Sequence, residues 1–270
     1  MVRIHAAVSD VGALDGLASQ DSLIHRLDPR AKIAVTAMFL AAVVSFPKYE
    51  IAEMMPLFLY PAVLSAVGQV PAKTLLRYLL LASPFALLVG VFNPLLDREV
   101  VVHWGSWAVT GGWLSFFSIL IRFVLTVSAA LLLLACTGYV SVCAALNRFG
   151  APRLLTMQFL MLYRFIFILS DEASRMVRAH GLRSGSGRKP TLRVWGSLAG
   201  HLLLRAYDRG LRVHAAMLAR GFDGTLHPPR AFRWRWADSL FVAGCALFLA
   251  LVRFGHVAER LGAWVLRVSG

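Results

Sequence analysis

Uncharged, apolar runs divide much of the chain into segments of nearly membrane-spanning length. Runs without Asp, Glu, Lys or Arg cover 33–47, 54–72, 78–96 and 123–147, and a shorter run covers 239–252. A helix needs about 20 residues to cross the hydrocarbon core of a bilayer, and fewer when flanking basic side chains snorkel. The pattern therefore predicts an all-α integral membrane protein with four to five transmembrane helices, or six at the upper count.

One further uncharged stretch, 100–120, has a different composition because it is rich in glycine and tryptophan. These residues are Gly105, Gly111, Gly112, Trp104, Trp107 and Trp113. Tryptophan is enriched at membrane–water interfaces. We therefore predict an interfacial loop at the outer face that runs into the fourth span.

Helical periodicity continues beyond the fourth span, where polar residues become frequent. Gly-Ala-Pro at 150–152 predicts a break, followed by a helix over 153–182 that is apolar in its first half and polar in its second. A Ser/Gly-rich loop follows at 184–190. A second amphipathic helix is predicted over 192–220, and Gly221 is expected to cap it. Its apolar face comprises Leu198, Leu202, Ala206, Val213 and Met217.

Composition and charge locate these segments relative to the bilayer. The chain is 58% hydrophobic and 16% charged, with a mean hydropathy of +0.67 and a net charge of +14. Of its charged residues, 16 basic and 4 acidic ones lie in 139–236. Because Lys and Arg in short loops favour the cytoplasmic side, we divide the chain into three parts. These are a cytoplasmic N-terminus with transmembrane helices 1–4 (1–138), a basic cytoplasmic segment (139–236), and a C-terminal transmembrane helix with its tail (237–270).

The beginning of the chain carries Asp10, Asp15, Asp21 and Asp28 without a continuous apolar run. We therefore expect no cleavable signal peptide and a cytoplasmic N-terminus. The predicted location is the bacterial cytoplasmic (inner) membrane, crossed several times. Because the basic excess adjoins membrane spans, we expect the lipid bilayer and protein partners there rather than nucleic acid.

Residues that could carry chemistry are scattered. The chain lacks a GxxxxGK[ST] phosphate-binding loop, and its eight histidines form neither HxxxH nor HExxH. Cys136, Cys143 and Cys245 form no CxxC pair and are predicted to be buried thiols. Arg122, near the start of the fourth span, is expected to snorkel to the interface. We predict no catalytic residue, no metal site and no cofactor bound by this chain.

Two other classes of membrane protein stay open as less favoured alternatives. An integral-membrane enzyme would place several carboxylates or histidines on facing helices, yet Glu53 is the only carboxylate inside a predicted span. A stand-alone carrier would have polar or broken helices at the midplane. Pro61 and Pro84 are candidates for kinks, but they have no polar partners in the sequence around them.

The two long helices of the basic segment end in a similar way. The first ends Ala-His-Gly-Leu-Arg-Ser at 179–184, and the second Ala-Met-Leu-Ala-Arg-Gly-Phe at 216–222. Anionic lipid would attract each arginine by about 1 kcal/mol but would not require small residues beside it. Ala and Gly permit close backbone approach, and a guanidinium supplies several donors to carboxylates or carbonyls. A socket on a partner protein therefore explains the combination better.

These residues resemble a known family. The sequence at 27–32, Leu-Asp-Pro-Arg-Ala-Lys, together with 15–18 and 22–26, is similar to the N-terminal signature of the T components of energy-coupling factor (ECF) transporters, above all the cobalt/nickel branch, the CbiQ family. The sequence at 216–224 resembles the second of that family's two Ala-Arg-Gly motifs, and the resemblance spans about 15–224. The signature residues are Asp28, Pro29, Arg30 and Lys32.

The resemblance implies a non-catalytic membrane scaffold that joins a substrate-binding membrane (S) subunit to two ABC-type ATPase subunits, with or without a small accessory membrane subunit. It also implies that the two helices are coupling helices in an X-like crossing, and that ATP on the partner subunits changes this crossing. The implied contact residues are Ala179, Arg183, Ser184, Ala219, Arg220 and Gly221. Ser184 stands where the family motif has Gly, and the sequence does not determine the effect of this replacement.

The implied cargo is cobalt or nickel, and a vitamin such as biotin is the alternative. The sequence does not choose among them because the T component does not bind the cargo selectively.

Overall fold

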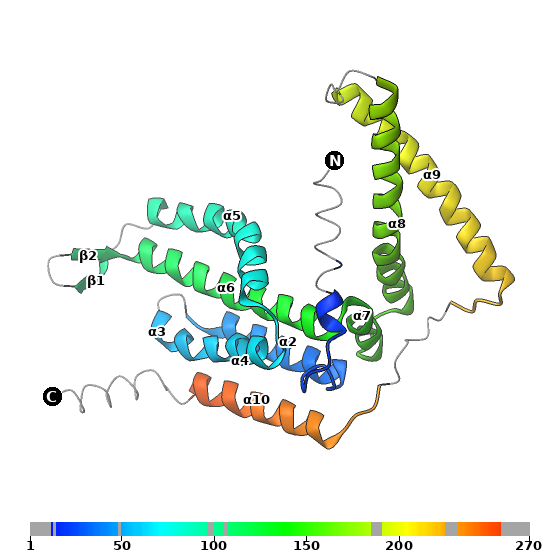
Figure 1. Cartoon of the computed structure of the whole chain (residues 1–270). Coiled ribbons are helices and arrows are strands. Elements are labelled where there is room, and N and C mark those ends of the chain that lie inside the picture. The colour runs from blue at the N-terminus through cyan, green and yellow to red at the C-terminus, as the bar shows by residue number, and fades with distance from the viewer. Residues whose placement is uncertain are drawn as a thin grey trace. The chain divides into compact units, whose positions relative to one another are not determined.

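The computed structural model describes residues 12, 15–47, 50–96, 100–104, 107–184, 191–224 and 232–254. The chain forms two compact units, each assembled from distant parts of the sequence (Figure 1). One combines Met1–Gly16 with Tyr139–Ala231, and the other combines Leu17–Gly138 with Phe232–Gly270. We call them the basic unit and the apolar unit. The three-part division made from the sequence stays a prediction.

The apolar unit is a set of packed helices with one short hairpin. Its elements are α2 (Pro29–Ser45), α3 (Ile51–Met54), the 3-10 helix η1 (Met55–Phe58), α4 (Leu59–Val67), α5 (Ala72–Leu96), β1 (Val100–Trp104), β2 (Trp107–Thr110), α6 (Gly111–Thr137) and α10 (Trp236–Phe254). The two strands pair antiparallel. Helix α6 packs against α5, α2 and α4, and α10 packs against α2 (Figure 1).

The core of the apolar unit is built from large apolar side chains of α2, α6 and η1. Phe39, Leu57, Leu125 and Leu132 are fully buried. The ring of Phe39 stacks on Tyr60, with 4.3 Å between ring centroids. Because lipid tails are as apolar as these side chains, close packing between the helices stabilises this core. Many large apolar side chains of α5 are exposed instead, as expected for a helix that faces lipid.

Three expectations about the apolar unit are wrong in detail. The segment 111–120 is helical and forms the first part of α6, rather than a loop. The run 54–72 is divided among α3, η1 and α4, which ends at Val67. The run 123–147 is divided at Gly138, whose φ of 78° lies in the left-handed region that favours glycine.

The basic unit contains the remaining helices of the described chain, α7 (Tyr139–Arg148), α8 (Arg153–Ser184) and α9 (Leu192–Ala219). Gly150 has a φ of 96°, and Pro152 precedes α8, so the predicted break at 150–152 is confirmed. Both long amphipathic helices are also confirmed, with α8 reaching Ser184. Figure 1 shows α9 crossing α8 near the upper part of that helix and then diverging from it.

Four helices are long and apolar enough to cross a membrane, which confirms an all-α, multi-pass membrane protein. They are Ala72–Pro94, Gly111–Thr137, Arg153–Ser184 and Trp236–Phe254. The set differs from the predicted spans in three places, because the runs 33–47 and 54–72 are absent from it and α8 is added. The 17 residues of α2 extend only about 25 Å. Helix α8 qualifies because its first half is almost entirely apolar.

Candidate functional site

The C-terminal end of α9 forms a glycine-capped turn around Arg220. Arg220 is the C-cap, and Gly221 follows with a φ of 76°. The Gly221 N–H donates to the Leu218 carbonyl over 3.0 Å, and the Phe222 N–H donates to the Met217 carbonyl over 3.0 Å. This pair of bonds is a Schellman motif. The prediction that Gly221 caps this helix is confirmed, and the turn directs the chain away from Arg220.

At the end of α8, Ser184 occupies the position that corresponds to Gly221. Ser184 is still helical, and its hydroxyl donates to the Gly181 carbonyl over 3.2 Å. Gly181 therefore lies inside the helix and does not end it. Arg183 occupies the last turn, where the negative end of the helix dipole favours a cation.

Both arginines present free guanidinium groups. Arg183 and Arg220 are exposed, and within the described ranges neither guanidinium makes a hydrogen bond or ion pair. Ala179 and Ala219 are exposed beside them. The two arginines are not brought together. Arg183 lies at the end of α8 next to the connection to α9, and Arg220 lies at the far end of α9, whose 28 residues extend about 42 Å.

Helices α8 and α9 form an antiparallel pair. The half-buried residues of α9 recur every three or four positions, and they include all five of the predicted face, Leu198, Leu202, Ala206, Val213 and Met217. That prediction is confirmed. The first half of α8 and the second half of α9 border an apolar groove of about 490 Å³. Its walls include Met157, Met161, Phe165, Gly210, Val213 and Met217.

The signature residues join three helices of the apolar unit. Asp28 is the N-cap of α2, and its Oδ1 accepts the Arg30 N–H over 2.9 Å, while Pro29 occupies the first helical turn. The Asp28 N–H donates to Oδ1 of the buried Asp238 over 2.7 Å. Lys32 donates from Nζ to the Cys136 carbonyl near the end of α6, over 2.9 Å.

Two further contacts hold the beginning of α10. Oδ2 of Asp238 accepts the Arg235 N–H over 2.7 Å, which is the reverse bond of a capping box. The Arg30 guanidinium lies 5.3 Å from the ring centroid of Phe232. The signature therefore positions α10 and the end of α6 against the start of α2.

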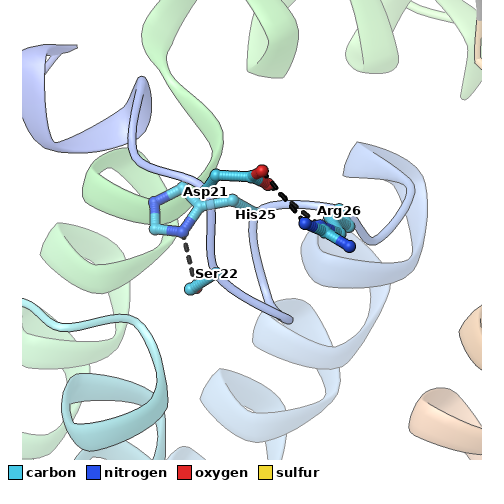
Figure 2. A network of polar contacts seen from close by, with 4 residues as sticks. All are labelled: Asp21, Ser22, His25 and Arg26. Atoms are coloured by element: carbon cyan, nitrogen blue, oxygen red, sulfur yellow. Dashed lines mark hydrogen bonds and ion pairs between the residues drawn. The ribbon is translucent and has the colours of Figure 1, made fainter.

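A turn preceding α2 carries two local polar contacts (Figure 2). Arg26 donates to both carboxylate oxygens of Asp21, over 2.9 and 3.0 Å. His25 Nδ1 lies 2.7 Å from the Ser22 hydroxyl. Burial, followed by the nearby Lys32 ammonium, lowers the pKa of His25 below its usual value.

Asp15, which the sequence singled out only as part of the signature, anchors the basic unit. Its Oδ2 accepts the Tyr163 hydroxyl over 2.8 Å, and its Oδ1 accepts the Tyr139 N–H at the start of α7 over 3.3 Å. The rings of Tyr139 and Tyr163 stack with 4.6 Å between centroids. Asp15 thereby links α7 to the first half of α8.

Sequence reasoning missed Asp238 and the ion pair of Glu172 with Arg205. An acid three residues into a helix is a capping signal, so the role of Asp238 at its own helix was readable. Its bond to Asp28 spans 210 positions and left no local pattern. In the part of the chain that the structure describes, no group of three or more His, Cys, Asp or Glu residues has a metal-binding arrangement.

Comparisons with known proteins identify relatives. A family model described as "Cobalt transport protein" (CbiQ) matches residues 20–231. The energy-coupling factor transporter transmembrane protein EcfT of Limosilactobacillus fermentum is 28% identical over 244 residues, which cover 83% of this chain and 89% of the relative.

Two shorter matches carry the names of metal transporters. The cobalt transport protein CbiQ of Rhodobacter capsulatus is 36% identical over 107 residues, covering 39% of this chain and 43% of the relative. The nickel permease LarQ of Lactiplantibacillus plantarum is 28% identical over 196 residues, covering 65% and 70%. The chain thus aligns with less than half of the CbiQ relative's length.

Proposed function

Because the chain belongs to the CbiQ family of cobalt transport proteins, a family of non-catalytic transporter membrane components, we propose that it is the coupling subunit of an ECF-type importer. In this role it transmits ATP-driven motion of two ATPase subunits to a substrate-binding membrane subunit. ATP binds to the partner subunits, and the cargo is cobalt or nickel. The membrane is the cytoplasmic (inner) membrane of a bacterium.

The observation that carries the proposal is the exposure of one guanidinium at the C-terminal end of each long helix. Arg183 and Arg220 have no partner within the described chain, although each could form charge-assisted hydrogen bonds. Small residues, Ala179 and Ala219, lie beside them and permit close approach of another backbone. Two docking sites suit two ATPase subunits.

The proposed cargo is supported by two relatives. The names of the cobalt transport protein CbiQ from Rhodobacter capsulatus and the nickel permease LarQ from Lactiplantibacillus plantarum refer to cobalt and nickel. The EcfT relative's name specifies no cargo, so a vitamin such as biotin is the alternative outcome of the test.

The test is to produce the tagged chain together with candidate ATPase and substrate-binding subunits from the same organism, and to measure ATP-dependent uptake of cobalt, nickel and biotin into liposomes. We expect both ATPase subunits to copurify and a metal ion to accumulate. Biotin accumulation would reassign the cargo. Transport by the purified chain alone would contradict the coupling role and favour a stand-alone carrier.

A further inference from the structure

Within the described residues, one ion pair joins α8 to α9. One carboxylate oxygen of Glu172 accepts a short contact from Arg205 Nη1 on α9, and the other accepts Arg175 Nη2 over 2.9 Å from the next turn of α8. The Glu172 side chain is only 18% exposed, whereas Arg205 is 62% exposed. The acid is therefore shielded between the helices, while its α9 partner reaches it from the surface.

The ion pair lies where the two helices meet and the apolar groove ends. Leu169 and Ala206 line the end of the groove. Leu169 lies three residues before Glu172 on α8, and Ala206 directly follows Arg205 on α9. Glu172 thus occupies the closed end of the groove, and the helices diverge from there toward Met157 and Met217.

The arms that extend from this point have comparable lengths. Arg183 follows Glu172 by 11 positions, about 16 Å along α8, and Arg220 follows Arg205 by 15 positions, about 22 Å along α9. A displacement of either arginine is therefore transmitted to the crossing point over about 16 to 22 Å of helix. If the crossing point is not fixed, such a displacement makes one helix slide along the other, and the crossing angle does not change.

We propose that Glu172 and Arg205 form the pivot of the coupling helices. The pair fixes where α8 and α9 cross, so that displacement of Arg183 and Arg220 changes the crossing angle and not the register. The inference rests on the proposed coupling function and assigns positioning residues to it. An apolar contact resists separation but tolerates sliding, whereas a charge-assisted bond between two particular residues specifies one register.

The alternative is that the Glu172–Arg205 ion pair only stabilises the folded chain. That role would not explain why the pair lies at the closed end of the groove. Exposed ion pairs shift an equilibrium by only about twofold to fivefold, and salt screens them. A shift of that size would scarcely affect folding. It is sufficient to favour one register of two helices that are otherwise joined by an apolar stripe.

The test uses the full-length chain in lipid nanodiscs, alone and with its partner subunits. Spin labels at Gln158 and His214, which lie on opposite walls of the groove, report the distance between the helices. The variants are Glu172→Gln, Glu172→Arg, Arg205→Glu and the reciprocal exchange of both residues. Asp171→Asn is the matched control because it removes an acid from the neighbouring, exposed position. Cargo uptake per ATP hydrolysed is measured for each.

We expect Glu172→Gln to broaden the distance distribution and to lower uptake per ATP about threefold, with ATPase copurification retained. The reciprocal exchange should restore both quantities, and Asp171→Asn should change neither. An unchanged distance distribution in Glu172→Gln, or failure of the reciprocal exchange to restore it, would overturn the pivot. Absence of ATPase copurification with the unmodified chain would instead refute the proposed function, while the distances in the chain alone would still decide about the pivot.

Discussion

At the scale of single residues, the signature before α2 has a structural role that its sequence does not suggest. Asp28 caps its own helix through its side chain and binds Asp238 through its backbone N–H. Lys32 extends the same connection to the last turn of α6. Because Asp238 is almost fully buried and accepts two backbone N–H groups, both of its oxygens are committed.

Asp238→Asn should destabilise the apolar unit. The amide would point one N–H₂ group at a backbone N–H, leaving a buried donor unsatisfied at a cost of about 1–3 kcal/mol. The thermal midpoint of the detergent-purified chain should fall for Asp238→Asn and remain unchanged for Asp208→Asn, which alters an exposed acid of α9. Equal midpoints for both variants would show that the Asp28–Asp238 bond contributes nothing.

His25 should make stability depend on pH. Since burial and the Lys32 charge lower its pKa in the folded chain, the neutral ring is favoured by folding. This contribution is complete above the unfolded value of 6.5 and is lost as the pH falls below it through the folded pKa. The thermal midpoint should therefore decrease in that range, and His25→Gln should flatten the decrease. An identical pH profile for His25→Gln and for the exposed His201→Gln would contradict this role.

At the scale of elements, the two proposed contact arginines lie in different local backbone structures. Helix α9 ends in a left-handed glycine directly after Arg220, whereas α8 continues as a helix through Arg183 to Ser184.

Gly221→Ala tests the geometry of the α9 end. No atom outside the turn lies within 4 Å of the added Cβ, so the cost is conformational strain alone, about 1–2 kcal/mol. ATPase copurification should weaken about fivefold to thirtyfold if docking requires this turn. Gly200→Ala is the control because it adds a Cβ in open space inside the same helix. Equal losses in both variants would refute a specific role for the turn.

Elements with strong periodicity were predictable, and breaks inside apolar runs were not. The face from Leu198 to Met217 was correct because α9 is amphipathic and has no buried residue to obscure its period. Gly138 interrupts an otherwise apolar run, so hydropathy did not register its left-handed turn. Gly111 and Gly112 suggested a loop, but both are buried in the first turn of α6, where small residues permit close packing.

At the scale of the whole molecule, α10 runs parallel to α2. The beginnings of the two helices are joined by Asp28 and Asp238, and their ends by Arg253, which donates to the Ser45 hydroxyl over 3.3 Å and lies over the Phe46 ring. If the basic residues before α2 are cytoplasmic, α10 therefore leaves toward the outer side. Arg253 departs from the positive-inside pattern because it binds the end of α2.

Arg122 of α6, like Arg253 of α10, contacts the end of α2. Its guanidinium donates to the Phe46 and Pro47 carbonyls over 2.7 and 2.9 Å. A cation at the last carbonyls of a helix is favoured by the helix dipole. Arg122 thus reaches the end of α2, and this contact explains an ionisable side chain within α6.

The most direct test of the account compares two pairs of basic residues in the same segment. Arg183→Glu/Arg220→Glu reverses the two helix ends, whereas Arg188→Glu/Lys189→Glu reverses the same charge in the connection between the helices, which lies outside the described residues. Truncating a buried charge-assisted contact costs about 2–5 kcal/mol, so the helix-end pair should abolish copurification of the ATPase subunits while membrane insertion persists. The connecting pair should retain copurification. Equal loss with both pairs would show that diffuse attraction to anionic lipid, and not docking of the two arginines, holds the complex together.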